Sequence, residues 1–339
     1  MAPVPLEDRV DPQLRDYLVN PPSRPRLSRL HPAADRVRAT DTHVKITNGP
    51  DARDVPVRVY RPAEADAEAP VVLFVHGGGF TLGELEQFDQ HCVWYATASR
   101  AVVVSVGYRL APQFPYPAAL HDAHAVWSWL TGGPDEEAGE GAGRRVGTGA
   151  AEIGVDPTRS AIIGSSSGAA IAAGLALYLR DRQEPLPSLL LHAPVLDDRH
   201  TTVSSQAITD PRTWNRAGSQ RGWRSYLGPV AGAADVPAYA APARATDLAG
   251  LPPTALILGD LELARDEALT FATRLAQADV PVELHIYPNA THGFDVVVPD
   301  AAVSLASRHV QGEALLRALH PADRETVRRT AMPACLHSS

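Results

Sequence analysis

Cysteine and lysine are scarce in this sequence of 339 residues. The 2 cysteines, Cys92 and Cys335, lie far apart, which excludes a disulfide framework and a metal site with the usual cysteine spacing. Lys45 is the only lysine, and the net charge is −8. A protein that binds nucleic acid needs a basic face, so we expect no nucleic-acid partner.

Long apolar runs are also missing. No run approaches the roughly 18 apolar residues that suggest a membrane span. Residues 1–10 carry acids and prolines where a signal peptide would have an apolar core. We therefore expect a cytoplasmic protein without a membrane span. The composition, with 45% hydrophobic and 21% charged residues, is that of a globular protein able to bury a large core.

Short apolar runs rich in β-branched residues alternate with longer helical patterns. The expected strands are Val57–Tyr60, Val71–Val75, Ala101–Val106, Ala161–Gly164, Leu189–His192, Ala255–Gly259 and Val282–Tyr287. The expected helices are Leu85–Ser99, Ala118–Leu130, Ser167–Arg180, Asp266–Ala278 and Ala302–Leu319. This alternation predicts an α/β protein with a mostly parallel sheet between helices. The two earliest strands are expected to join antiparallel at one edge.

Three regions depart from the alternation. Residues 1–42 are rich in Pro and Arg, with one candidate helix at Pro12–Val19. Residues 132–151 are rich in Gly, and residues 197–247 have scattered aromatics without a strand pattern. We expect a core formed by residues 43–196 and 248–320, with a two-part cap formed by residues 1–42 and 197–247. Residues 132–151 are expected to be an inserted mobile loop, and residues 321–339 a tail.

A candidate nucleophile lies in Gly164-Ser165-Ser166-Ser167-Gly168, which fits the pattern G-x-S-x-G. The pattern alone is weak, but here an apolar run, Ala161–Ile163, leads into it and a helix of small residues follows. Such a turn exposes its central serine, and the flanking glycines relieve crowding. We therefore expect Ser166 to be the nucleophile. The context disfavours the alternative, a turn without chemistry.

Three consecutive glycines follow the strand expected at 71–75, in His76-Gly77-Gly78-Gly79-Phe80. Backbone amides in such a loop can point toward a developing oxyanion without interference from side chains. The expected donors are the N–H groups of Gly78 and Gly79, together with that of Ser167 after the nucleophile. A phosphate-binding loop is the alternative, but the sequence has neither the G-x-G-x-x-G order nor a Lys-Ser/Thr pair here.

A base must take the proton from the serine, and His292 has the fitting position among 13 histidines. It lies in Thr291-His292-Gly293-Phe294, after the last expected strand. This agrees with the chain order serine, acid, histidine. The acid should follow the strand expected at 255–259, where four candidates crowd together: Asp260, Glu262, Asp266 and Glu267.

The last two of these acids are expected to open the next helix, because acidic residues are favourable at a helix N-terminus. Glu262 is better placed in the loop and is the expected triad acid. Asp260 remains the alternative.

Taken together, these segments resemble the hormone-sensitive-lipase family of bacterial esterases, also called the HGGG-containing carboxylesterases, from about Val44 to Phe294. Further segments typical of that family are Tyr108-Arg109-Leu110-Ala111-Pro112, Tyr116-Pro117-Ala118-Ala119 with Asp122, Gly250-Leu251-Pro252-Pro253 and Arg265-Asp266-Glu267. The resemblance implies an α/β-hydrolase fold with a helical cap. It also implies Ser166 as nucleophile, His292 as base, and no cofactor. Glu262 stands where the family usually has Asp, and G-S-S-S-G replaces the more usual G-D-S-A-G.

The expected function is that of a serine carboxylesterase that hydrolyses small hydrophobic esters with short acyl chains through an acyl-enzyme intermediate. The expected partner is therefore a small-molecule ester, and a homodimer is left open. Aromatic side chains are expected to bind the substrate, although those of the cap equally suit simple core contacts. They are Phe80, Trp214, Trp223 and Tyr226.

Two alternatives belong to other classes. A non-catalytic small-molecule binder on the same fold is disfavoured, because Ser166, His292 and an acid are all present. A metalloenzyme would use His121, Asp122 and His124, whose two histidines fall on adjacent helix positions. A solvated helix face explains that group better, so no metal site is expected.

Overall fold

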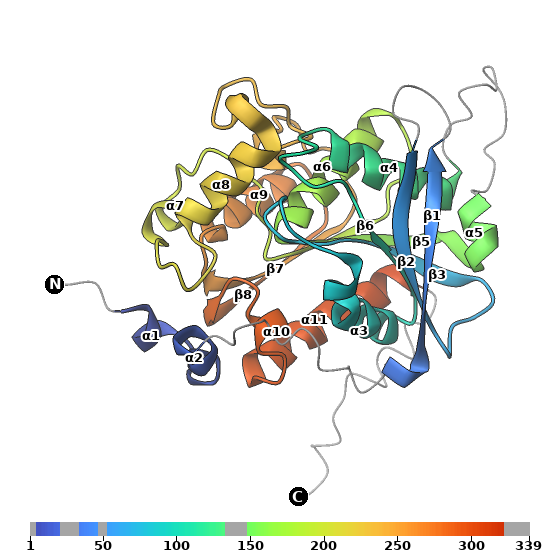
Figure 1. The fold of residues 1–339 in the computed structure, drawn as a ribbon, viewed down its shortest axis with the longest axis horizontal. Helices are drawn as coiled ribbons and strands as arrows, with labels where there is room; N and C mark the ends of the chain where they lie inside the picture. Colours follow the sequence, from blue (N-terminus) through green and yellow to red (C-terminus); the bar gives the residue numbers. More distant parts are fainter. Residues whose placement is uncertain (1–4, 21–33, 47–52, 133–147, 322–339) are drawn as a thin grey trace, which may run out of the picture.

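The computed structural model describes residues 5–20, 34–46, 53–132 and 148–321 (Figure 1). One eight-stranded sheet crosses the molecule in the spatial order β1-β2-β4-β3-β5-β6-β7-β8. The strands are β1 (Val37–Ile46), β2 (Arg53–Pro62), β3 (Ala69–Val75), β4 (Val102–Val106), β5 (Val155–Ser165), β6 (Ser188–His192), β7 (Thr254–Leu261) and β8 (Val282–Thr291).

Most of the sheet is parallel, as the alternation of strands and helices predicts. From β4 through β3, β5, β6 and β7 to β8, each strand pairs in parallel with its neighbour. The seven expected strands correspond to β2 through β8. Parallel neighbours place their carboxyl ends at one edge of the sheet, so the loops that follow these strands meet there.

The antiparallel edge differs from the expectation. It is formed by β1 and β2, and β2 in turn pairs antiparallel with β4. The two earliest expected strands, now β2 and β3, are not neighbours. Strand β1 was missed because its sequence, VRATDTHVKI, is mostly polar and most of its side chains are exposed. As a result, Val37–Thr42 lie in the sheet and not in a cap.

Helices cover both faces of the sheet (Figure 1). Helices α3 (Asp89–Ser99) and α11 (Ala302–Leu319) pack together on one face, and α4 (Ala118–Thr131), α6 (Ser167–Asp181) and α9 (Arg265–Gln277) lie on the other. The single helix expected at Leu85–Ser99 is a 3-10 turn, η2 (Leu85–Phe88), followed by α3.

Alternate residues of the central strands face the two helical layers. Val71, Leu73 and Val75 of β3 belong to the larger apolar cluster, and Val72 and Phe74 belong to the cluster under α3 and α11. Each such side chain contributes about 1.5–3 kcal/mol when it leaves water. Burial on both faces explains why these strands are apolar throughout.

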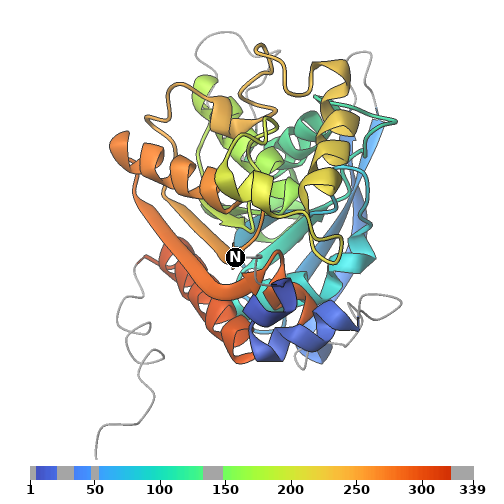
Figure 2. The same cartoon turned by 90° about the vertical axis from the view of Figure 1, so that its left-hand side faces the viewer.

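Two segments lie beside the carboxyl edge of the sheet. Residues 197–247 form α7 (Val203–Ala207), α8 (Arg216–Leu227), η3 (Gly228–Val230) and η4 (Pro242–Arg244), without a strand. The N-terminal helices α1 (Leu6–Arg9) and α2 (Pro12–Val19) lie near α10 (Phe294–Val297), as Figure 2 shows. The two segments touch where Arg212 forms an ion pair with Glu7, with 2.6 Å between Nη2 and Oε2.

The expected loop at 132–151 is partly helical. Gly132 ends α4, and Thr148–Ala151 belong to α5 (Thr148–Ile153). Gly149 packs so closely on the Trp129 ring that an added Cβ would lie 2.2 Å from its Cδ2. Residues 133–147, like the tail at 322–339, lie outside the described residues. Within the described part of the chain, no helix is long and apolar enough to cross a bilayer.

Candidate active site

Four loops at the carboxyl edge of the sheet carry the expected site residues. His76 directly follows β3, Ser166 follows β5, Glu262 follows β7 and His292 follows β8. These strands lie side by side in the parallel part of the sheet, with β6 between β5 and β7. Residues more than 200 positions apart in the sequence, such as His76 and His292, therefore meet at one edge.

Ser166 occupies a strained turn between β5 and α6. Its φ of 54° and ψ of −120° lie in a region that L-residues rarely adopt. Such strain costs on the order of 1–3 kcal/mol and is typical of functional turns. Its backbone N–H donates to the His192 carbonyl of β6 at 2.8 Å, which fixes the turn against the sheet. The arrangement is that of a nucleophile elbow.

The side chains of Ser166 and His292 meet in a hydrogen bond. Ser166 Oγ lies 2.8 Å from His292 Nε2. The His292 side chain is 11% exposed, so the imidazole is largely shielded from bulk water but still partly accessible. This is the contact through which a histidine can take a proton from a serine hydroxyl.

Glu262 is the carboxylate that faces the other nitrogen of His292. Its Oε2 lies 3.6 Å from Nδ1 of His292, and its side chain is fully buried. Among the described residues, neither Glu262 oxygen has a hydrogen-bond donor. The separation is longer than a hydrogen bond, but catalytic hydrogen bonds are often long before substrate binds. Asp260 forms no contact of this kind, and its Oδ1 is buried without a partner in the described structure.

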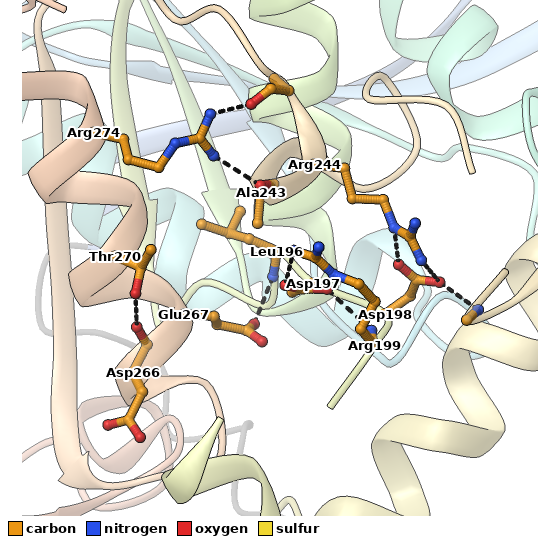
Figure 3. A network of polar contacts seen from close by, with 12 residues as sticks. Leu196, Asp197, Asp198, Arg199, Ala243, Arg244, Asp266, Glu267, Thr270 and Arg274 are labelled. Atoms are coloured by element: carbon orange, nitrogen blue, oxygen red, sulfur yellow. Dashed lines mark hydrogen bonds and ion pairs between the residues drawn. The ribbon is translucent and has the colours of Figure 1, made fainter. Parts of the chain in front are cut away.

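The segment that follows Glu262 fixes its loop in place. Asp266 and Glu267 lie in the first turn of α9, which confirms that they open this helix. Asp266 Oδ2 accepts from the Ser204 N–H at 2.7 Å. Glu267 Oε1 accepts from the Leu196 N–H at 2.7 Å, as Figure 3 shows. These bonds join α9 to residues 196–204, so the acids beside Glu262 hold the backbone around it.

The glycine loop packs directly against the nucleophile turn. The Phe80 N–H donates to Ser167 Oγ at 3.1 Å, so the side chain of Ser167 joins the two segments. Gly78 and Gly79 have φ values of 121° and 61°, which disfavour any other residue. A Cβ on Gly79 would also lie 2.7 Å from Cη2 of Trp214. The loop with Gly78 and Gly79 thus lies beside the turn that carries Ser167, and the role of these residues as oxyanion donors stays a prediction.

His76, at the start of this loop, packs against Tyr108. The Tyr108 hydroxyl donates to the His76 carbonyl at 2.8 Å, and the two rings stack with centroids 4.2 Å apart. Phe88 stacks on the other side of His76 at 5.0 Å. Burial lowers the pKa of His76 to about 4, so this imidazole is neutral and has a packing role. The sequence indicated Tyr108 only as part of a family segment, without a role.

The four expected substrate-binding aromatics divide into two groups. Trp214 stacks near His292, with ring centroids 6.0 Å apart. Phe80, Trp223 and Tyr226 are instead almost fully buried. Phe80 lies 4.3 Å from the Tyr226 ring and 4.7 Å from the Trp223 ring, measured between centroids. These three side chains form a packed cluster behind the glycine loop and do not line the cavity beside His292.

That cavity has a volume of about 220 Å³. Its walls come from α2, from the loop before α8 and from the residues around His292, and they combine apolar with polar side chains: Leu14, Tyr17, Leu18, Pro211, Arg212, Thr213, Trp214, Thr291, His292, Phe294, Val297 and Val298. Helix α2 was expected in the sequence, but its contribution to this cavity was not. A larger cavity of about 460 Å³ lies where β6, β7 and β8 begin, at the opposite edge of the sheet from Ser166.

The candidate metal ligands face other partners. Asp122 is buried and accepts from Arg109 Nε at 3.0 Å and from the Arg109 N–H at 2.9 Å, and Arg53 pairs with it as well. His124 Nε2 lies 3.1 Å from Glu184 Oε2. Within the described residues, no group of three or more His, Cys, Asp or Glu side chains is placed to hold a metal ion.

Comparisons with known proteins agree with this geometry. Residues 72–296 match the alpha/beta hydrolase fold family. Esterase LipI of Mycobacterium tuberculosis is 34% identical over 293 residues, which are 85% of this chain and 82% of that protein. An ethyl acetate hydrolase of Pseudomonas putida is 31% identical over 254 residues, which are 72% of each chain.

The solved structure of esterase LipW from Mycobacterium marinum superimposes with a TM-score of 0.78 at 37% identity, over 93% of this chain and 98% of that one. The chain therefore belongs to the α/β-hydrolase superfamily, in its hormone-sensitive-lipase-like family of esterases.

Proposed function

We propose that this carboxylic ester hydrolase uses Ser166 as its nucleophile, His292 as its base and Glu262 as the acid that orients the base. The observation that carries the proposal is the 2.8 Å contact between Ser166 Oγ and His292 Nε2 at the apex of the strained turn. Glu262 completes the arrangement, because a buried carboxylate at Nδ1 favours the tautomer with its proton there and stabilises the imidazolium that forms.

In the first half of the reaction, Ser166 Oγ attacks the acyl carbon of the ester while His292 Nε2 takes the hydroxyl proton. The carbonyl oxygen becomes negatively charged in the tetrahedral intermediate. The N–H groups of Gly78, Gly79 and Ser167 stabilise this charge, and each such donor typically contributes about 2.7–4 kcal/mol. His292 then gives its proton to the leaving alcohol, and the acyl group stays on Ser166.

In the second half, a water molecule replaces the alcohol. His292 removes a proton from this water, which attacks the acyl carbon and forms a second tetrahedral intermediate at the same oxyanion site. Collapse of that intermediate returns the proton from His292 to Ser166 Oγ and releases the carboxylic acid. The cycle needs no cofactor.

We further propose that the substrates are small hydrophobic esters with short acyl chains. The cavity of about 220 Å³ beside His292 has room for a small group, and apolar side chains such as Leu14, Leu18 and Trp214 form part of its walls. The ethyl acetate hydrolase among the relatives agrees with this substrate class. Helices α1 and α2 and residues 197–247 would act as the cap, with Trp214 as its substrate contact.

The test is hydrolysis of p-nitrophenyl esters from acetate to long acyl chains by the wild type and by Ser166→Ala. We expect turnover to peak at short chains and to fall by about 10⁴-fold or more in the variant. Ser188→Ala, at the start of β6 on the opposite sheet edge, is the matched control and should behave like the wild type. Full activity in Ser166→Ala would refute the assignment.

Three further points concern the alternative function, the oligomeric state and the location. A non-catalytic binder would hold esters without turnover in the same assay, and nothing in the relatives favours it. A homodimer is proposed along β8, because it is an edge strand of the sheet and such a strand can pair with a strand of a second copy. Light scattering of the purified protein would show twice the mass of one chain if the dimer forms.

The cytoplasmic location stays a prediction from the sequence.

A further inference from the structure

A second chain of hydrogen bonds begins beside the nucleophile and takes no part in the proposed reaction. Ser165 Oγ lies 3.2 Å from His192 Nδ1, and His192 Nε2 lies 2.7 Å from Asp295 Oδ1. The side chains of His192 and Asp295 are only 4% and 3% exposed. An ionisable pair so deeply buried is costly to desolvate, so its presence beside Ser166 needs an explanation.

The carboxylate of Asp295 is well satisfied on its other side. Its Oδ2 accepts from Ser307 Oγ at 2.7 Å and from Gln311 Nε2 at 2.7 Å, both on α11. Gln311 Oε1 in turn accepts from the Tyr95 hydroxyl of α3 at 2.7 Å. Asp295 is thereby anchored to the helical layer beneath the sheet, and its position is fixed independently of His292.

This pair connects the two segments that carry the reacting groups. The His192 carbonyl accepts the N–H of Ser166 at 2.8 Å, and His192 pairs with Ser165 in the register of β5 and β6. Asp295 lies three residues after His292, in the short helix α10. A single side-chain contact of 2.7 Å thus links the nucleophile turn to the loop of the base.

We propose that His192 and Asp295 are positioning residues, which hold the His292 loop where Nε2 stays within hydrogen-bonding distance of Ser166 Oγ. This inference rests on the proposed function of Ser166 and His292. A misplacement of about 1 Å in such a pair can lower the rate about 100-fold, which is why a fixed connection between the two segments matters for catalysis.

The charges around the pair agree with this role. Burial alone would lower the pKa of His192, but the charge and hydrogen bond of Asp295, with a contribution from Glu262, raise it. The pKa of Asp295 is held well below its usual range: burial opposes this, and His192 and the Ser307 hydroxyl outweigh the burial. Both shifts favour the charged forms, an imidazolium beside a carboxylate.

Two neighbouring groups, Arg308 and His91, do not reverse these pKa shifts. Arg308 of α11 lowers the pKa of His192, but less than Asp295 raises it. Burial lowers the pKa of His91 to about 3, so that imidazole is neutral and adds no charge. His192 contacts Asp295 through Nε2 and the Ser165 hydroxyl through Nδ1, so both of its ring nitrogens have a partner.

The test compares His192→Phe, which removes both hydrogen bonds, with His192→Gln, whose amide can still donate to Asp295. In p-nitrophenyl acetate hydrolysis, we expect His192→Phe to lower kcat about 10- to 100-fold with little change in KM. We expect His192→Gln to retain kcat within about threefold, because it restores the hydrogen bond without the charge. The rate at which diethyl p-nitrophenyl phosphate modifies Ser166 should fall in parallel with kcat.

The matched control is the contact of His124, on α4, with Glu184, which follows α6, because it too joins an imidazole to a carboxylate. We expect His124→Phe to leave kcat and KM unchanged. A folded His192→Phe variant with wild-type kcat would overturn the proposal, and so would an equal loss in His192→Gln and His192→Phe.

If His192→Phe does not fold, as judged by circular dichroism, Asp295→Asn decides the matter. It preserves the shape of the side chain, but its amide has one acceptor oxygen, whereas Asp295 accepts on one side from His192 and on the other from Ser307 and Gln311. One side therefore loses its acceptor, and the variant should also lower kcat about 10-fold or more at unchanged KM. A wild-type kcat in Asp295→Asn would overturn the proposal. Ser166→Ala is measured in the same assay. If it retains activity, the proposed function itself fails; if it is inactive, a wild-type kcat in Asp295→Asn refutes only the positioning role.

Discussion

The carboxyl group of Glu267 accepts the backbone N–H of Leu196 at 2.7 Å, and both groups are buried beneath the start of α9 (Figure 3). This bond ties the helix that follows Glu262 to the chain that leaves β6. Burial raises the pKa of Glu267 well above its ordinary value of 4.5, and the nearby Asp197 adds to the effect. The carboxyl group therefore keeps its proton to a higher pH than an exposed glutamate does.

The state of Glu267 predicts how stability depends on pH. In the unfolded chain this group ionises near 4.5, whereas in the folded chain it keeps its proton to higher pH. The folded state thus binds more protons, so this contribution to stability is fully present below about pH 4.5 and is lost as pH rises. The slope from one such group is at most about 1.4 kcal/mol per pH unit.

Glu267→Gln should remove this slope, because its amide oxygen still accepts the Leu196 N–H but has no proton to lose. Urea unfolding of both proteins between pH 5 and 8 would show the wild type losing stability relative to the variant as pH rises. Glu68→Gln, an exposed change, is the control and should follow the wild type. Parallel curves for the wild type and Glu267→Gln would contradict the prediction.

The choice of triad acid can be tested with two substitutions that each remove one charge. Glu262→Gln should lower kcat by about 100-fold or more, because the carboxylate at His292 Nδ1 no longer stabilises the imidazolium. Asp260→Asn should have a smaller effect, since Asp260 forms no contact with His292. Steady-state kinetics of both variants decide the question: a larger loss in Asp260→Asn would assign the role to Asp260.

The close approach of the glycine loop to Trp214 predicts a strong effect of a single methyl group. Gly79→Ala should lower kcat by about 10²–10³-fold, because the new Cβ would lie 2.7 Å from Trp214 Cη2 and displace an oxyanion donor. Gly232→Ala is the control for backbone strain, since Gly232 also has a positive φ, of 82°, but has open space around it.

The double variant Gly79→Ala with Trp214→Ala isolates the contact itself. Removing the indole should recover part of the lost kcat, as judged against Trp214→Ala alone in a double-mutant cycle. If the two changes are strictly additive, the loss in Gly79→Ala comes from the backbone and not from the indole.

The aromatic residues of α8 and the loop before it should respond differently to truncation. Trp223 is almost fully buried in the cluster with Phe80, so Trp223→Ala should destabilise the fold by about 3–5 kcal/mol. Trp214→Ala should cost less stability and instead shift activity toward longer acyl chains, because Trp214 lines the cavity at His292. Urea unfolding and the p-nitrophenyl ester series measure the two effects. An unchanged chain-length profile in Trp214→Ala would contradict its assignment to the pocket.

Much of this protein follows from local patterns in its sequence. The helices at Pro12–Val19 and Ala302–Leu319 have the expected bounds, because apolar periodicity and flanking residues are local signals. The central strands β3 through β7 follow from another local signal, since stretches of strand buried on both faces must be apolar. Ser166, His292 and Glu262 were indicated by motif and chain order, both of which can be read without coordinates.

Only the tertiary structure decided what the sequence left open. Strand β1 is half exposed, so its pairing with β2 leaves no apolar pattern to recognise. Trp214 and Trp223 are nine residues apart with similar sequence surroundings, yet one lines the cavity and the other packs in the core, because packing depends on distant segments. The contact of His192 with Asp295 spans 103 positions, and only the meeting of strand ends at one sheet edge brings such residues together.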